Sequence, residues 1–282
     1  MLTRLLSELE NQETGGLFSY SIVVVDNDEA ESAREAVALS AGRAEIPVQY
    51  CVEPQQGIAH ARNKAVSCAG GDLVAFIDDD EFPKKDWLMN LFNALLEFQC
   101  DGVLGPVIPH FDVTPPAWVL KGRFFDRPEH VTGFILPWNY TRTGNVLFKK
   151  NIIPDPENAF NTSFITGEDR DFFRRMIERG CQFVWCNEAP AFEVVPPNRW
   201  KLKFLLKRAL MRGENSVKHG IGGFRGVLKT VSAIIIYTAV LPIFFIFGRH
   251  LFVEYLVKDF DHIGRLLALM NINVIGDQYV IE

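Results

Sequence analysis

Residues 71–80 read Gly-Asp-Leu-Val-Ala-Phe-Ile-Asp-Asp-Asp, and this stretch decides the fold class. Its apolar residues, Leu73 to Ile77, predict a short strand buried on both faces. A strand that ends in carboxylates delivers them to the carboxyl edge of a sheet, where open α/β sheets bind ligands. Such oxygen ligands suit Mg²⁺ or Mn²⁺, which complete their shells with phosphate oxygens. Taken alone, the three aspartates at 78–80 could equally be a solvated acidic turn ahead of Pro83.

The composition limits the classes of protein that the chain can belong to. Its 282 residues can form one large α/β domain, or one domain with a smaller appendage. A net charge of −6 argues against general nucleic-acid binding. The five cysteines are odd in number and lack CxxC spacing, so we expect neither zinc nor a disulfide framework, and we expect a reducing compartment. The chain opens with a charged amphipathic segment, which is not the pattern of a signal peptide.

Strand-like and helix-like stretches alternate in the first half of the chain. Strands are predicted at 21–25, 48–52 and 73–77, with helices at 2–9 and 32–41 and helix starts at Gly57 and Pro83. This alternation is typical of a doubly wound, mostly parallel sheet. A proline- and aromatic-rich loop then runs to Tyr140, and loops of this length are usually functional.

The C-terminal part, residues 199–282, has the composition of a membrane-associated segment. Nine basic residues and one acidic residue lie between Arg199 and Lys229, and 199–212 has leucines on one helical face. Residues 230–248 carry no charge and, at about 19 residues, are near the minimum for a bilayer span, so we expect spanning or deep insertion. A buried hairpin helix and an interfacial segment bent at Pro242 are the alternatives. The positive-inside tendency places residues 1–229 on the cytoplasmic face of the plasma membrane. Residues 250–270 predict a second amphipathic helix.

Acidic residues recur at three predicted strand ends or helix starts: Asp26 with Asp28, then 78–80, then Glu168 with Asp169. Each alone could be a turn, a cap or a partner of a helix dipole. In this order, with Gly-Ile-Ala-His-Ala-Arg-Asn at 57–63 and Gly-Asn at 144–145, they resemble the glycosyltransferase family 2 enzymes. The resemblance covers roughly residues 1–200, and Asp-x-Asp followed by Gly-Glu-Asp-x-Asp is its specific part. Within the family, the chain looks closest to the bacterial exopolysaccharide glucosyltransferases of the succinoglycan type.

The resemblance implies the Rossmann-like A-type fold and a site for a nucleotide-sugar donor, with UDP as the expected nucleotide. The donor-binding residues would be Asp26, Asp28, Gly57, Arg62, Asn63, Asp78 and Asp79. Asp80 together with Asp78 would hold Mg²⁺ or Mn²⁺, which acts on the diphosphate as a Lewis acid. Asp169 would be the base that deprotonates the acceptor hydroxyl as the sugar inverts. The acceptor-binding residues would be Glu168, Asn145 and Trp138, and Asp171 is expected to face the basic residues of its own helix.

Two features depart from the family pattern. Family members begin with a strand and a Thr/Tyr/Asn-rich loop ahead of the helix that opens this chain, and we expect that a misassigned start or a truncated gene product explains the difference. Processive relatives have Gln-x-x-Arg-Trp where residues 196–200 here read Pro-Pro-Asn-Arg-Trp. The lost glutamine favours transfer of a single sugar.

The sequence therefore predicts a glycosyltransferase catalytic domain at 1–198, followed by membrane-associated helices at 199–282. The leading hypothesis is a metal-dependent, inverting hexosyltransferase. It would move one sugar from a UDP-sugar to a lipid-linked saccharide, a polyprenyl diphosphate derivative, in polysaccharide biosynthesis. A non-catalytic or truncated membrane-bound paralogue is the second hypothesis. A nucleotidyltransferase or phosphatase is the third, but the spacing of an Asp nucleophile and a later Lys that such phosphatases need is not found.

Overall fold

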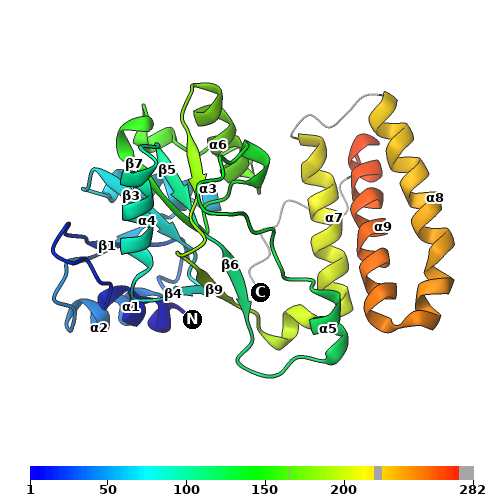
Figure 1. Ribbon diagram of the computed structural model, residues 1–282, viewed down its shortest axis with the longest axis horizontal. Coiled ribbons are helices and arrows are strands. Elements are labelled where there is room, and N and C mark those ends of the chain that lie inside the picture. Colours follow the sequence, from blue (N-terminus) through cyan, green and yellow to red (C-terminus); the bar gives the residue numbers. More distant parts are fainter. Residues whose placement is uncertain (165, 219–223, 273–282) are drawn as a thin grey trace. The chain divides into compact units, whose positions relative to one another are not determined.

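The computed structural model describes residues 1–164, 166–218 and 224–272, and the chain divides into two compact units (Figure 1). The α/β unit comprises Met1–His110 and Arg127–Val194. The helical unit comprises Phe111–Asp126 and Val195–Glu282. The predicted boundary at residue 198 therefore lies close to the second junction between the units. No local pattern in residues 111–126 indicates that they belong with the C-terminal helices.

The strands of the α/β unit form one parallel sheet and two mixed sheets in the described part of the chain. A two-stranded sheet pairs β1 (Ile22–Asp26) in parallel with β2 (Val48–Val52). A four-stranded sheet has the order β3-β7-β5-β8, and a three-stranded sheet has the order β4-β9-β6. The bounds of these strands are β3 Leu73–Ile77, β4 Glu81–Pro83, β5 Gly102–Leu104, β6 Val107–His110, β7 Asn145–Lys149, β8 Phe183–Trp185 and β9 Ala191–Val194. The predicted α/β class with a mixed sheet is confirmed, although antiparallel pairing through β7 is as prominent as parallel pairing.

The prediction that the strand at 73–77 is buried on both faces is confirmed only in part. Its two faces pack against different apolar clusters, Val74 and Phe76 on one side and Leu73 and Ile77 on the other, but Ala75 is exposed. Strand β3 lies at the edge of its sheet and pairs, within the described strands, with β7 alone. Likewise β1 pairs there with β2 alone. An apolar run indicates that a strand is formed, but it does not say how many neighbours the strand has.

Helices pack against these sheets and form the core with them. Their bounds are α1 Leu2–Glu10, α2 Arg34–Ala41, α3 Ile58–Cys68, α4 Trp87–Glu97 and α6 Glu168–Glu178, with 3-10 turns η1 Trp138–Tyr140, η2 Lys150–Ile152 and η3 Pro156–Asn158. Phe172 and Phe173 are core residues, and they pack near Phe148 and Phe183. The helix predicted from Pro83 begins instead at Trp87, because Glu81–Pro83 pairs with β9 as β4.

The helical unit consists of α5 (Ala117–Gly122), η4 (Pro197–Trp200) and three long helices. The long helices are α7 (Leu202–Lys218), α8 (Phe224–Phe247) and α9 (Arg249–Leu269), and α9 lies between the other two (Figure 1). The predicted helices at 199–212 and 250–270 are thus confirmed as parts of α7 and α9. The side chains of Lys218 and Arg225, counted in the predicted basic stretch, lie outside the described residues. Gly226–Phe247 is long and apolar enough to cross a membrane, and it is the one such helix among the residues described.

Candidate active site

The loop after β1 is held in shape by the Asp26 carboxylate. Its Oδ1 accepts a hydrogen bond from the Asp28 amide at 3.0 Å, and its Oδ2 accepts from the Ala33 amide and the Tyr50 hydroxyl, both at 2.8 Å. Desolvation and the bond to Asp26 raise the pKa of Tyr50 to about 12. Because the buried carboxylate already has three donors, this geometry does not support a direct contact between Asp26 and a nucleotide. The Asp28 side chain accepts from Ser32, which lowers the pKa of Asp28.

Asn27 joins this loop to the start of α3. Its Nδ2 donates to the carbonyls of Glu53 and Gln55, both at 2.7 Å, and its Oδ1 accepts from the Gly57 amide at 2.8 Å. Gly57 has a φ of 135°, a conformation that favours glycine. Asn27 is a site residue that was not among those predicted. Its position between two aspartates was the available signal.

Arg62, on α3, brings together the two most specific motifs of the sequence. Its guanidinium forms a buried ion pair with Glu168 at the start of α6, and lies 3.4 Å from Oδ1 of Asp78 at the end of β3. The Arg62 side chain is 14% exposed, whereas that of Asp78 is 43% exposed. Burial raises the pKa of Glu168 to about 7, although the charge of Arg62 opposes this shift. Asp78, Arg62 and Glu168 therefore form one charged cluster.

Asn63, the neighbour of Arg62, is a packing residue in this structure. Its Nδ2 donates to the Phe160 carbonyl at 2.9 Å, and its Oδ1 accepts from the Phe160 amide at 2.7 Å. These two bonds fasten α3 to the segment before α6. Asn63 thus helps to fix the position of α3, which carries Arg62. Its geometry does not support the predicted direct contact between Asn63 and a nucleotide sugar.

Glu81, directly after the aspartate triplet, is a site residue that the sequence analysis missed. It is 2% exposed, and neither carboxylate oxygen has a hydrogen-bond partner among the described residues. Burial, with the nearby Asp78, raises the pKa of Glu81 well above its usual value. A Cβ atom placed on Gly144 would lie 2.8 Å from Oε1 of Glu81 and 3.1 Å from Oδ2 of Asp78, so both carboxylates flank that glycine. Asp79 is exposed, and the backbone carbonyl of Asp80 accepts a hydrogen bond from the Val194 amide at 2.8 Å.

The carboxylate oxygens around the three aspartates at 78–80 fit a cation that binds together with a phosphate group. The described residues contain no group of three His, Cys, Asp or Glu arranged to hold a metal ion. Mg²⁺, however, usually takes only one or two carboxylates from the protein and the remaining ligands from water and phosphates. The half-exposed Asp78, with the unpartnered Glu81 oxygen beside it, matches that chemistry.

Arg142 is a second residue that the sequence analysis missed. Burial lowers the pKa of its guanidinium to about 10, and the nearby charge of Arg127 acts in the same direction. The carboxylates of Glu81, Glu193 and Asp169 oppose this shift, so Arg142 lies among them and remains protonated at neutral pH. Arg127 itself forms an ion pair with Glu193. Both arginines were overlooked because an isolated arginine in an irregular segment carries no motif and no periodic pattern.

The start of α6 presents three acidic residues in different environments. Glu168 and Asp171 are buried, whereas Asp169 is partly exposed. Oδ2 of Asp171 accepts from Nε of Arg175 at 2.8 Å, and Oδ1 lies 3.5 Å from Arg174. The prediction that Asp171 faces the basic residues of its own helix is therefore confirmed. Asp169 is the carboxylate of this turn that solvent can reach.

The two remaining predicted acceptor residues differ from one another. Trp138, at the start of η1, is partly exposed and lies in a turn that packs against α6. Asn145 is fully buried: its Oδ1 accepts from Trp87 Nε1 at 2.8 Å, and its Nδ2 donates to the carbonyls of Pro106 and Ala189 at 2.9 and 2.8 Å. This geometry does not support an acceptor contact by Asn145, which instead ties α4 to two loops.

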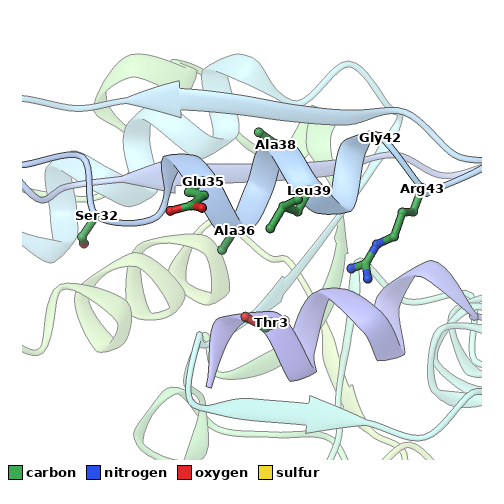
Figure 2. Close-up of a pocket in the computed structure, with 8 residues that line it drawn as sticks. All are labelled: Thr3, Ser32, Glu35, Ala36, Ala38, Leu39, Gly42 and Arg43. Atoms are coloured by element: carbon green, nitrogen blue, oxygen red, sulfur yellow. The ribbon is translucent and has the colours of Figure 1, made fainter.

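A shallow groove lies between α1 and α2 (Figure 2), and one of its lining residues, Ser32, bonds to the predicted donor residue Asp28. Its lining residues are Thr3, Ser32, Glu35, Ala36, Ala38, Leu39, Gly42 and Arg43. None of them is a predicted site residue. The groove has an apolar floor made of α2 side chains and small residues, and it lacks the paired carboxylates of the cluster around Arg62.

Known proteins share this combination of fold and motifs. The family model described as Glycosyl transferase family 2 matches residues 1–173. The succinoglycan biosynthesis protein ExoM of Rhizobium meliloti is 35% identical over 201 residues, which cover 68% of this chain and 62% of that protein. The glucosyl-dolichyl phosphate glucuronosyltransferase of Haloferax volcanii is 33% identical over 97 residues, 34% of this chain and 30% of that one.

Solved structures of Staphylococcus aureus TarS have a similar fold. The complex of TarS residues 1–349 with UDP-GlcNAc matches with a TM-score of 0.53 at 13% identity, covering 97% of this chain and 89% of that one. The complex with UDP matches with a TM-score of 0.52 at 14% identity, covering 96% and 88%. At these identities the likeness shows the fold alone. The family match extends over more than half of the sequence, and on that basis the chain belongs to glycosyltransferase family 2.

Proposed function

We propose that this chain transfers a single hexosyl group from a UDP-sugar to a lipid-linked saccharide, with inversion at the anomeric carbon. The observation that carries the proposal is the position of Arg62, which pairs with Glu168 and approaches Asp78. One guanidinium thereby links the carboxylates expected at the donor diphosphate to the helix turn expected to hold the base. A glycosyl transfer needs these two groups on either side of one sugar.

The substrates are inferred from the relatives. The TarS complexes contain UDP or UDP-GlcNAc, which supports a UDP-sugar donor for this chain. ExoM is a succinoglycan biosynthesis protein, which supports a role in making an extracellular polysaccharide. The name of the Haloferax relative includes a dolichyl phosphate-linked sugar, which supports a lipid-linked acceptor. The apolar Gly226–Phe247 segment is consistent with such an acceptor, since its length and composition suit a membrane. Because basic residues precede this segment, we place the chain at the cytoplasmic face of the plasma membrane.

We assign the chemical roles as follows. Asp78 and Asp80 would hold Mg²⁺ or Mn²⁺, which neutralises charge on the departing diphosphate when it is bound. Asp169, partly exposed at the start of α6, would accept the proton of the acceptor hydroxyl as that oxygen attacks the anomeric carbon. Arg62 would keep Glu168 oriented, and Arg142 would supply positive charge beside the site. Trp138 would contact the acceptor sugar through its ring.

Calorimetric titration of UDP, with and without Mn²⁺, tests the donor part of the proposal. The unmodified protein and Asp80→Ala are compared, and Asp72→Ala is the matched control because Asp72 lies just before β3, at the opposite end of that strand. We expect Mn²⁺-dependent binding by the unmodified protein and the control, and loss of that binding in Asp80→Ala. Absence of UDP binding by all three proteins, with no transfer of labelled glucose from UDP-glucose to extracted lipid, would favour the hypothesis of a non-catalytic paralogue.

A further inference from the structure

The three long helices of the helical unit pack as a layer with α9 in the middle (Figure 1). The backbones of α7 and α9 approach closely, since a Cβ atom on Gly213 or Gly264 would collide with backbone of the other helix. Arg212 on α7 forms a two-bonded ion pair with Asp261 on α9, both distances being 3.0 Å. This tight, charge-paired crossing makes α7 and α9 a single packed pair.

Helix α8 packs against the other side of α9 and runs antiparallel to it. The rings of Phe244 and Tyr255 stack at 3.9 Å, and the Thr238 hydroxyl donates to Asp259 Oδ2 at 3.0 Å. These contacts extend over most of α8, since Tyr237 also lies against Tyr255 and against His262, one turn beyond Asp259. Because of these contacts, α8 would take α9 with it on moving from water into lipid.

The opposite face of α8 is apolar and uncovered. Ile246 is 82% exposed, Ile235 64% and Leu228 58%. Only 6% of the apolar stretch is buried within the described structure, so this helix is not the core of the unit. An exposed apolar face of this length marks an interaction surface. A basic residue lies near each end, because Lys229 is in the second turn of α8 and Arg249 begins α9 just after Gly248, and both are exposed.

Two helices oppose an orientation in which α8 crosses the bilayer: α9, which packs against α8, and α7, which packs against α9. At 24 residues α8 is about 36 Å long, so its length would suffice for a span. However, α9 would have to cross with it, and α9 carries Glu254, Lys258, Asp261 and Arg265. The α7 helix, joined to α9 at the glycine crossing, carries Lys203, Lys207, Arg208 and Arg212. Charged side chains are strongly disfavoured in the hydrocarbon core.

We propose that α8 lies lengthwise in one leaflet, with its Ile235–Ile246 face among the acyl chains, and that the chain is held at the membrane from one side. The partner that covers this face of α8 is an anionic lipid surface. The exposed cations Lys229 and Arg249 support this assignment, since in the lengthwise orientation both ends of α8 reach the same layer of head groups. In a transverse helix the same two cations would lie on opposite sides. The inference rests on the membrane association within the proposed function, and not on the sugar chemistry.

Sidedness of labelling in sealed vesicles tests the orientation. Phe247→Cys reports the far end of α8, and Leu39→Cys, at a 61% exposed position in the α/β unit, reports the side of that unit. Both proteins are labelled with an impermeant maleimide in right-side-out and inverted membrane vesicles, and peptide-resolved mass spectrometry separates the new cysteines from the native ones. We expect both positions to be labelled from the same side. Labelling of residue 247 from the side opposite to residue 39 would overturn the proposal.

Flotation with vesicles of phosphatidylglycerol and phosphatidylcholine tests the identity of this partner. Ile246→Asp is expected to lower the fraction of bound protein at least about tenfold, because it places a charge on the acyl-chain face. Leu39→Asp, at a 61% exposed apolar position outside the helical unit, should leave flotation unchanged. Unchanged flotation of Ile246→Asp, or a soluble dimer that covers α8 and does not float, would contradict the proposal. Neither measurement depends on sugar transfer, so a failed transferase assay does not affect it.

Discussion

Arg62 forms a buried ion pair with Glu168, 106 residues further along the chain. The same guanidinium lies 3.4 Å from Asp78. The carboxylates at the end of β3 and at the start of α6 are thus kept together by a cation on a third element, α3. This relationship makes the geometry of the site dependent on one side chain.

Arg62→Met is expected to lower both stability and UDP affinity. Removing one partner of a buried ion pair typically costs about 3–5 kcal/mol, because the other charge is left in a poor environment. The double variant Arg62→Met/Glu168→Gln should recover most of the melting temperature but not the UDP affinity. Arg34→Met, which removes an exposed pair with Glu31, is the control and should cost at most about 1 kcal/mol. Equal stability of the two single variants would contradict the role of Arg62.

The pKa of Glu168 predicts how stability depends on pH. Folding raises this pKa from 4.5 to about 7, so between these values the folded state binds a proton that the unfolded state has released. The free energy of unfolding should therefore fall as pH rises from 4.5 to 7, and this contribution should be constant above pH 7. Glu168→Gln removes that contribution, so its melting temperature should depend less on pH. Glu81 shifts in the same direction and should leave a residual slope. Identical pH profiles for the unmodified protein and Glu168→Gln would refute the assignment.

Asp169 and Asp171 form a matched pair for separating chemistry from structure. Asp169→Asn should abolish sugar transfer while leaving the melting temperature and UDP binding nearly unchanged, because this partly exposed carboxylate is proposed as the base. Asp171→Asn should lower the melting temperature, because it weakens buried pairs with Arg174 and Arg175. Transfer rate, calorimetric UDP binding and thermal unfolding are measured on both proteins. Retained transfer in Asp169→Asn would require another base.

Gly144→Ala tests the contact between the aspartate triplet and Glu81. The new methyl group would meet oxygens of Glu81 and Asp78 at 2.8 and 3.1 Å, and both side chains would have to move. We expect Mn²⁺-dependent UDP binding to weaken about tenfold, equivalent to about 1.4 kcal/mol. Gly70→Ala is the control, since a Cβ atom there meets nothing within 4 Å. Equal UDP affinities in the two variants would show that UDP binding does not require the present positions of the Glu81 and Asp78 carboxylates.

The sequence was sufficient to predict the elements and the family motifs, because both depend on local patterns. It could not show which polar residues turn inward. Asn145 and Asn63 were predicted to touch substrates, yet each forms buried hydrogen bonds to loops distant in the sequence. Glu81 was missed because its burial depends on pairing between β4 and β9, where it lies opposite Glu193. Such long-range pairings leave no periodic signal in the residues around them.

The helical unit has a consequence for attempts to isolate the catalytic part. Residues 111–126 belong to this unit, and their Val119 and Phe125 are buried in a cluster with Leu205 and Val253. A protein cut at residue 198 would keep the two apolar side chains and lose those that cover them. Each uncovered side chain forfeits about 1.5–3 kcal/mol and gains a surface prone to aggregation. The proposed membrane anchor is therefore not a detachable tail, and recombination at a single junction cannot replace it.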